Sequence, residues 1–291
     1  MSEGVFEKRR EARGSSLLLE AAGLRWLARA EAAGGIRVAR VERVTDDELV
    51  EERVETGAPS RVAARRIGAG LARMHAAGAP WLGCPPAGWA ALVDGRAADV
   101  PACRGYWVGR ARTPLVPRGR AAASWGEFFA EHRIMYYVRL LRDSGRLDAG
   151  GASLLERVAS RVASGAFDSP QPRLVREAMA ADPGTACARL HGDLWAGNVL
   201  WGAGPKGAPA GGVLIDPMAH GGHAETDLAM LQLFGYPYLD EVLAGYDEAS
   251  PLADGWGERV GLHQLSPLLL HCVLFGGPYV PETLEVARRY V

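Results

Sequence analysis

The sequence predicts an α+β protein with two lobes: a small mixed lobe, residues 1–56, and a larger, mainly helical lobe, residues 57–291. Two observations support this prediction. Apolar residues alternate over residues 36–54, which is typical of half-buried strands. After the break at residues 56–59 the apolar spacing becomes helical in six or seven segments. A chain of 291 residues can bury one or two cores of this kind.

The small lobe is expected to begin with a short strand that contains Val5, Phe6 and Lys8. Ser15 and Ser16 then open a helix that ends at the glycine pair 34–35. Two strands follow, one over residues 36–44 and one over residues 49–54, and residues 45–47 form the turn between them.

The large lobe is expected to begin with a helix that starts near Pro59 and runs to His75. Residues 79–122 are rich in Pro, Gly and Arg, and their lack of a sustained period predicts an extended loop. Ser124 and Glu127 form a capping box that opens a helix to about Leu141. Further helices are predicted at 151–164, 170–181, 224–233, 236–248, 257–275 and 281–290.

Composition excludes several classes of protein. The chain has 33 basic and 34 acidic residues and no basic segment interleaved with aromatic residues, so nucleic acid is not an expected partner. The first residues lack an apolar signal segment and no apolar run is long enough to span a membrane, which predicts a cytoplasmic protein without a membrane partner. The four cysteines lack metal-ligand spacing and are expected to be reduced thiols.

The most informative motif is His191-Gly192-Asp193 with Asn198 five residues after the aspartate. An apolar run then leads to Asp216. Phosphoryl transfer from ATP needs an oriented acceptor hydroxyl and divalent metal on the triphosphate. Asp193 is the candidate base, and Asn198 and Asp216 are the candidate ligands of Mg²⁺. The alternative is an ordinary turn with a capping aspartate, followed by a strand that ends at Asp216.

The segments HGDLWAGNVLW (191–201) and LIDPMAHGGHAETDLAMLQLFG (214–235) resemble the fructosamine kinase, or ketosamine-3-kinase, family. The similarity extends to residues 252–277 and more loosely to residues 20–24. It implies a bilobal protein-kinase-like fold related to the aminoglycoside phosphotransferases. It also implies ATP- and Mg²⁺-dependent phosphorylation of the sugar 3-hydroxyl of ketosamines, which promotes deglycation. Acceptors would be small ketosamines or glycated protein lysines, and the protein would be a monomer.

The resemblance also implies roles for residues outside the motif. Lys8 would contact the phosphates and Glu20 would position Lys8, unless both are solvated surface residues. Backbone groups of Glu52 and Val54 would bind the adenine. Trp195 would line the acceptor pocket, unless it only packs in the core. Three residues remain: His223 would organise the loop or touch the substrate, whereas His191 and Asp227 would support the catalytic loop.

The sequence departs from the family pattern at its start, because only seven residues precede Lys8 and the glycine hairpin over the phosphates has no room. Either the gene start lies upstream of Met1 or the protein is a truncated relative, and in both cases we expect this chain to have a truncated small lobe with an open strand edge. This leaves two alternatives to a ketosamine kinase. One is a nucleotide-binding pseudokinase. The other is an aminoglycoside or other small-amine kinase whose acceptor site would use acidic residues among Asp240, Glu241, Asp247, Glu248 and Glu258.

Three further patterns are not assigned to the site. Residues 202–207 match GxGxxG but are followed by Ala-Pro-Ala-Gly-Gly, so they predict a hairpin loop. His220 and His223 could be zinc ligands, but the glycines between them disfavour a helical ligand pair. His75 is expected to be an ordinary histidine at a helix end.

Overall fold

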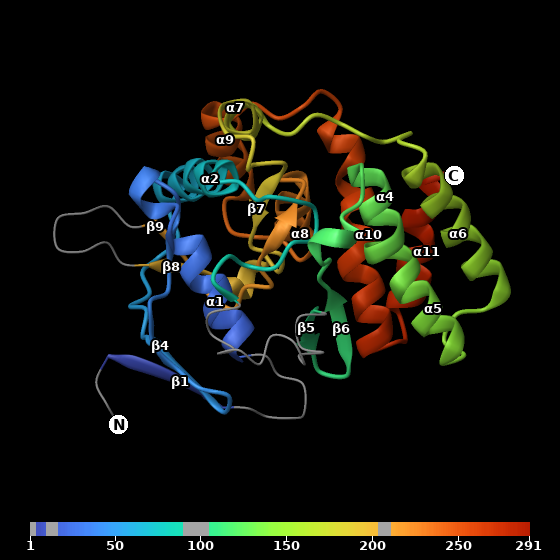
Figure 1. Cartoon of the computed structure of the whole chain (residues 1–291), viewed down its shortest axis with the longest axis horizontal. Helices are drawn as coiled ribbons and strands as arrows, with labels where there is room; N and C mark the ends of the chain where they lie inside the picture. The colour runs from blue at the N-terminus through green and yellow to red at the C-terminus, as the bar shows by residue number, and fades with distance from the viewer. Residues whose placement is uncertain (1–3, 10–16, 90–104, 203–210) are drawn as a thin grey trace.

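A small antiparallel sheet lies at one end of the molecule (Figure 1). The computed structural model describes residues 4–9, 17–89, 105–202 and 211–291. In the sheet, β4 (Glu48–Glu52) lies between β1 (Val5–Arg9) and β3 (Val41–Val44). Lys8 pairs with Leu49 of the central strand. The strand predicted around Lys8 is therefore present, and among the described strands it pairs only with β4.

The predicted strand over residues 36–44 is split in two, which corrects the expectation from sequence. Its first part, β2 (Arg37–Val38), pairs in parallel with β9 (Gly211–Leu214), whereas β3 pairs with β4. The amide of Ala39 also donates to the carbonyl of Leu214. This short pairing connects the first quarter of the chain directly to the hairpin that follows the HGD motif.

Helix α1 (Leu17–Ala28) is buried on most sides, and its leucines 19, 24 and 27 are fully buried. It shares a hydrophobic core with α2 (Arg61–Ala76) and α9 (Leu239–Ala249). Helix α2 begins after Ser60, whose hydroxyl accepts a hydrogen bond from the amide of Ala63. Pro59 therefore precedes the cap and does not lie in the first turn.

Glycines let α2 and α9 approach closely. A Cβ on Gly68 would lie 1.9 Å from the carbonyl oxygen of Val242, and a Cβ on Gly245 would lie 2.2 Å from the carbonyl oxygen of Arg65. Real carbon and oxygen atoms do not approach so closely, so any side chain at either position would push the helices apart. Arg61 and Arg65 at the same contact form ion pairs with Glu241.

Two short antiparallel strand pairs flank the loops that carry the HGD motif and Asp216. β7 (Ala188–Leu190) pairs with β10 (His220–Gly222), and β8 (Val199–Gly202) pairs with β9. The HGD segment lies between β7 and β8, and Asp216 lies between β9 and β10. The GxGxxG segment starts at the end of β8 and enters residues 203–210, which lie outside the described residues; the strands that flank it form the predicted hairpin.

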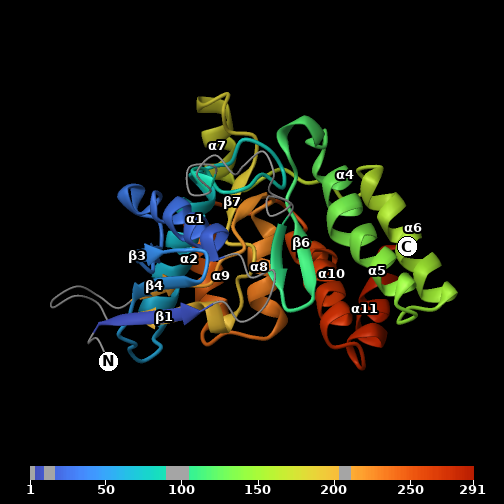
Figure 2. The ribbon, with the colours of Figure 1, turned by 60° about the horizontal axis from the view of Figure 1, so that its bottom comes forward.

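The other end of the molecule is a helical layer around a second core (Figures 1 and 2). The helix predicted from the capping box is present, and the Ser124 hydroxyl accepts from the Glu127 amide. It consists of α4 (Trp125–Phe129), a π-helical segment (Ala130–Met135) and α5 (Tyr136–Asp143). The layer also contains α6 (Ala149–Ala163), α10 (Trp256–Leu274) and α11 (Tyr279–Ala287). Helix α7 (Arg173–Ala181) packs against α2, and α8 (Glu225–Leu233) packs against α10.

The predicted loop over residues 79–122 is wrong in part. It contains a hairpin, β5 (Gly105–Val108) and β6 (Ala111–Pro114), turned by Gly109 and Arg110. The hydroxyl of Tyr106 donates to the carbonyl of Ala219, so this hairpin packs beside the loop that carries Asp216. Residues 90–104 of the predicted loop lie outside the described residues.

Three other expectations concern the whole chain. The lobe boundary near residues 55–58 stays a prediction; the core that contains α1 also includes residues of α2 and α9. Within the described residues, each helix is too short or too polar to cross a membrane. Cys84, Cys187 and Cys272 are buried free thiols, and Cys103 lies outside the described residues.

Candidate active site

Asp193, Asn198 and Asp216 are brought together between β7 and β10. The Asn198 carboxamide nitrogen donates to the Asp193 carboxylate at 3.0 Å and to the Asp193 carbonyl at 2.9 Å. The same nitrogen lies 3.4 Å from the carbonyl oxygen of Asp216. These bonds orient the carboxamide by its nitrogen, which leaves its oxygen available as a ligand.

The Asp193 carboxyl group is a suitable proton acceptor near neutral pH. Burial raises its pKa to about 7, and the nearby carboxylates of Asp216 and Asp227 also raise it, against the lowering effect of the Asn198 hydrogen bond. A base whose pKa lies near the working pH combines a useful deprotonated fraction with enough basicity to take a hydroxyl proton.

The loop around Asp193 is held by a buried carboxylate. Asp227, in the first turn of α8, accepts hydrogen bonds from the amides of His191 at 2.7 Å and Gly192 at 2.9 Å. His75 contacts the same carboxylate at 3.2 Å and the Tyr246 hydroxyl at 2.8 Å. Asp227 thus contacts the backbone of His191 and Gly192, and His75 in turn contacts Asp227. The supporting role of His191 and Asp227 stays a prediction.

The hydrogen bonds of the loop also define the protonation state of the His191 ring. Its Nε2 lies 2.9 Å from the carbonyl of Ile215, and its Nδ1 accepts from the amide of Asp193. Burial lowers the pKa of His191, which favours the neutral ring that both contacts require. Gly192 has φ of +82°, and a Cβ there would lie 2.2 Å from the Met218 carbonyl, so the turn needs glycine.

Lys8 on β1 connects the small sheet to α1 and to the loop that carries Asp216. Its ammonium lies 2.6 Å from a carboxylate oxygen of Glu20 on α1 and 2.6 Å from one of Asp216. Burial alone would lower the pKa of Lys8, but the two carboxylates outweigh it and raise the pKa, so Lys8 is protonated. Lys8 and Glu20 are therefore not independent surface residues.

Asp216 has an unusual backbone. Its φ is +52°, a left-handed conformation that few residues other than glycine adopt, and it precedes Pro217. The conformation accompanies a half-exposed carboxylate, 42% of whose side chain is accessible, between Lys8 and the Asp193 loop. Local strain of this kind is commonly stored where a side chain must be held for function.

The structure adds one carboxylate that the sequence did not identify. Glu51 on β4 is 3% exposed, and one of its carboxylate oxygens has no hydrogen-bond partner in the described part of the chain. Oxygen atoms of Glu20, Glu51 and Asp216 lie within 4.8 Å of one another. Burial, reinforced by Glu20, raises the pKa of Glu51 to about 7.

The two residues expected to bind adenine differ in their surroundings. The Glu52 amide already donates to the carbonyl of Arg40, and the Glu52 carboxylate pairs with Arg37 at 2.8 Å. The Glu52 amide is therefore not free to donate to a purine, which disfavours adenine binding by this amide. Val54 is half-buried beyond the end of β4, and no described residue forms a backbone hydrogen bond with it.

The two residues expected to bind the acceptor are also separated. Trp195 is 40% exposed and contacts Phe234, with 6.4 Å between ring centroids. It is a surface aromatic residue beside the catalytic loop and not a core residue. His223 is 2% exposed and lies in a different, buried environment.

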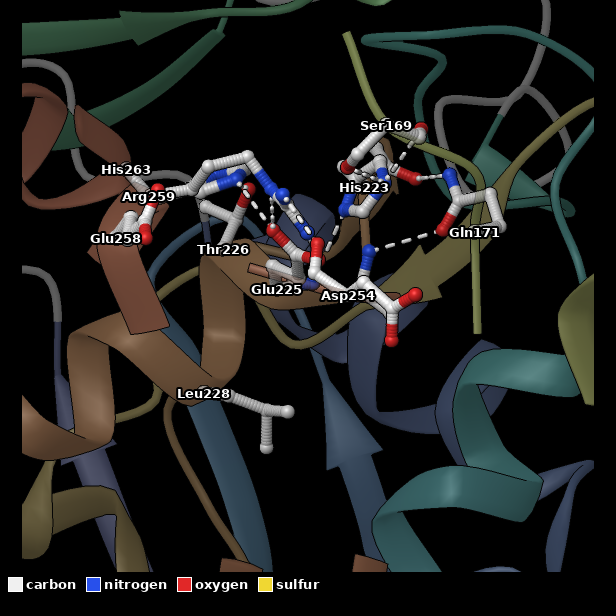
Figure 3. Close-up of polar contacts among 12 residues, drawn as sticks. Ser169, Gln171, His223, Glu225, Thr226, Leu228, Asp254, Glu258, Arg259 and His263 are labelled. Atoms are coloured by element: carbon white, nitrogen blue, oxygen red, sulfur yellow. Dashed lines mark hydrogen bonds and ion pairs between the residues drawn. The ribbon is translucent and has the colours of Figure 1, made fainter. Parts of the chain in front are cut away.

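That environment is a polar network that connects α8 and α10 with residues 169–171 (Figure 3). The His223 Nε2 faces the carbonyl and hydroxyl of Ser169, and its Nδ1 accepts from the amide of Glu225. Both ring nitrogens are thus occupied. The structure consequently gives His223 a scaffolding position, and acceptor binding by this residue stays a prediction without a geometric basis.

Glu225 is the centre of this network. Arg259 donates to both of its carboxylate oxygens, at 2.9 and 2.6 Å, and His263 lies 3.3 Å from one of them (Figure 3). Burial would raise the Glu225 pKa, but the hydrogen bonds from Arg259 and His263 lower it to about 2. His223, Glu225 and His263 have the spacing of a metal site. A metal would have to displace the Arg259 cation, so the donor set does not suit one.

Comparison with known sequences gives consistent matches. A sequence profile described as fructosamine kinase matches residues 112–291. The chain is 34% identical over 168 residues to a "probable ketoamine kinase" of Vibrio parahaemolyticus, and the match covers 57% of this chain and 49% of that protein. With a "probable ketoamine kinase" of Synechocystis the identity is 29% over 243 residues, covering 83% and 66%. The chain thus spans about half the length of the first of these curated relatives.

Comparison with solved structures extends the similarity to nearly the whole chain. A "putative fructosamine-3-kinase" from Thermobifida fusca has a TM-score of 0.77 at 38% identity, covering 98% of this chain and 85% of that one. The gentamicin complex of the phosphotransferase APH(2")-IIa has a TM-score of 0.60 at 10% identity, covering 100% and 88%. The second likeness concerns the fold alone. Together they confirm the predicted protein-kinase-like α+β fold.

Proposed function

The chain belongs to the fructosamine kinase family, and from that premise we propose that it is an ATP-dependent kinase of ketosamines. The observation that carries the proposal is the convergence of Asp193, Asn198 and Asp216 with the Lys8–Glu20 ion pair. These residues come from four separate parts of the sequence. Their arrangement matches the needs of phosphoryl transfer, namely a base, metal ligands and a phosphate-binding cation.

Asp193 is the proposed base. With a pKa of about 7 it orients the acceptor hydroxyl and takes its proton as the bond to phosphorus forms. Lys8 contacts the phosphates of ATP and Glu20 positions it. Val54 remains the proposed backbone contact for adenine at the end of β4.

Mg²⁺ fits the residues present. Asn198 offers a carboxamide oxygen and Asp216 a half-exposed carboxylate, and hard divalent cations prefer such oxygen ligands. When bound, the ion would neutralise charge on the transferring phosphate. The role of this chain's residues is to hold those oxygens beside Asp193, which the Asn198 hydrogen bonds and the left-handed Asp216 backbone accomplish.

The proposed position of phosphorylation is the 3-hydroxyl of the sugar, and the proposed consequence is deglycation. In a ketosamine, loss of a proton from C1 forms an enaminol that expels phosphate from C3. Water then hydrolyses the resulting C1 imine and releases the amine. The amine can be a small molecule or a protein lysine.

The test measures ADP release with a fructosyl- or ribulosyl-lysine as acceptor, together with phosphorus NMR to locate the new ester. The expected results are a phosphate on C3 and later release of phosphate and free lysine in equal amounts. Absence of acceptor-dependent ADP release, in a preparation that binds Mg-ATP, would refute the proposal. An ester on another carbon would retain the kinase but refute the deglycation step.

An aminoglycoside acceptor is less favoured. Glu241 pairs with Arg61 and Arg65, and Glu248 also pairs with Arg65, on the contact between α2 and α9. These acidic residues are neutralised by basic residues instead of lining a polycation site. The convergence of Asp193, Asn198 and Asp216 with the Lys8–Glu20 ion pair likewise favours an enzyme over a pseudokinase.

A further inference from the structure

A small, partly open cavity of about 50 Å³ lies beside Asp193. Its polar lining comes from β6, the π-helical segment, the catalytic loop, β10 and α10, and includes Thr113, Arg133, Asp193, His220 and His271. The volume suffices for a few water molecules or for a small polar group of a ligand. Because Asp193 forms part of the wall, whatever enters this cavity lies next to the proposed base.

Arg133 is the unusual member of the lining. It is 4% exposed, and its Nη1 donates to the carbonyls of Pro114 at 2.9 Å and His132 at 3.1 Å. Its Nη2 is buried and has no hydrogen-bond partner in the described residues. Burial lowers its pKa to about 10, so it remains a cation at neutral pH. A buried cation whose N–H groups lack acceptors destabilises the fold unless a ligand or a water molecule accepts their hydrogen bonds.

A second buried arginine shows what a purely structural role looks like in this protein. Arg189 donates through Nε to Gly78, through Nη1 to Trp26 and through Nη2 to Ala77, all at backbone carbonyls. Each of its nitrogens is satisfied within the fold. Arg133 differs, and it lies in a π-helical segment, a local irregularity that is frequent at functional sites.

His271 supplies a second unpaired group to the same cavity. Its Nδ1 is buried without a partner in the described part of the chain, and burial lowers its pKa, which favours the neutral ring. The ring also contacts the exposed side chains of Phe234 and Phe275, with centroids 5.4 and 5.6 Å away. His271 therefore lies between the cavity and the protein surface.

We propose that Arg133 and His271 bind hydroxyl groups of the sugar chain of the acceptor inside this cavity, while the hydroxyl to be phosphorylated lies at Asp193. This inference rests on the proposed function. A hydroxyl can accept from the Arg133 guanidinium and donate to a neutral His271 nitrogen, which satisfies both groups. A carboxylate can only accept, and it would be repelled by Asp193 in the same wall.

The experiment combines changes in the protein with changes in the acceptor. Arg133→Met is titrated calorimetrically with a six-carbon fructosyl-alkylamine, with the four-carbon erythrulosyl-alkylamine that lacks the outer hydroxyls, and with fructosyl-glycine. Loss of a hydrogen bond to a charged donor predicts about 10- to 100-fold weaker binding of both six-carbon acceptors. The variant should discriminate between the six- and four-carbon chains less than wild type does. Mg-ATP affinity is the specificity control.

Two further variants serve as a substitute for Arg133→Met and as a control. Arg133→Lys retains a cation near the Pro114 carbonyl, so it replaces Arg133→Met in the same comparison if the latter does not fold. Arg189→Met is the matched control, for which we expect a lower thermal midpoint and ketosamine affinity within about twofold of wild type, because its donors serve only the fold.

Unchanged affinity for the six-carbon acceptors in Arg133→Met, or in Arg133→Lys where it takes the place of Arg133→Met, would overturn the inference while leaving the kinase proposal intact. A loss confined to fructosyl-glycine would also overturn it, since Arg133 would then bind the carboxylate. If wild type binds and phosphorylates none of the ketosamines, the proposed function fails and this inference fails with it.

Discussion

Arg259→Met should destabilise the protein because it leaves the Glu225 carboxylate buried without its main partner. Glu225 is 2% exposed and receives two hydrogen bonds from Arg259. Its pKa falls from 4.5 to about 2 on folding, a difference of about 2.5 units at ~1.36 kcal/mol each, or roughly 3 kcal/mol. Breaking a buried ion pair by removing one partner typically costs about 3–5 kcal/mol, which agrees.

The assay is urea unfolding of wild type and variant at pH 7 and at several lower values. Because folding lowers the Glu225 pKa, its stabilising contribution is present above about pH 4.5 and is lost as the pH falls towards about 2. Without Arg259, burial dominates and the variant gains stability as Glu225 is protonated. The difference between the proteins should therefore be about 3 kcal/mol at pH 7 and shrink as the pH falls below 5.

A matched surface pair provides the control. Arg289 lies 3.8 Å from Glu285, and both side chains are more than half exposed, so Arg289→Met should change the unfolding free energy by less than about 0.5 kcal/mol. A loss below ~1 kcal/mol for Arg259→Met, or a loss that does not change between pH 7 and pH 4, would refute the reasoning.

Four other outcomes are expected. Asp193→Asn should keep the fold and Mg-ATP binding but lower turnover at least ~100-fold, since a positioned base contributes about 10²–10⁴; near wild-type turnover would exclude Asp193 as the base. Asp216→Ala should abolish metal-dependent ATP binding in calorimetry, and retained binding would remove it from the metal site. Gly68→Ala should lower the unfolding free energy by about 1–3 kcal/mol because of the Val242 carbonyl, whereas Gly257→Ala, with no atom within 4 Å, should not; equal effects would argue against the close helix contact. Glu51 has a raised pKa, so its protonated form stabilises the fold at low pH and this contribution is lost between about pH 4.5 and 7. Glu51→Gln should therefore gain up to roughly 3 kcal/mol over wild type at pH 8 and nothing near pH 4, and a gain that does not vary with pH would contradict this assignment.

The sequence predicted the helices well where an apolar period, as in α5 and α7, or a visible cap such as Ser124 marks them. The sequence-based prediction failed for strands whose bounds depend on which other strand they pair with. Residues 36–44 read as one alternating strand, but the two halves pair with strands that are far apart in the sequence. The β5–β6 hairpin was overlooked although the aromatic run at 106–107 and Gly109 were available signals.

The candidate site shows the same limit. Asp193, Asn198 and Asp216 could be identified because their spacing is itself the signal. Burial could not be deduced in this way, so Glu51, Arg133 and the Glu225 network were not foreseen. For His223 the sequence left two roles open, organising the loop or touching the substrate, and only its burial shows that the ring faces Ser169 in the interior.

The Lys8 ammonium that bridges Glu20 and Asp216 acts as an internal counter-ion. Before any nucleotide arrives, the carboxylate proposed to hold Mg²⁺ already has a cation at 2.6 Å. On the proposed function, Asp216 would exchange the Lys8 ammonium for Mg²⁺, and Lys8 would then be free to contact a phosphate of ATP. The Asp216 carboxylate would thereby have a cationic partner both before and after nucleotide binding.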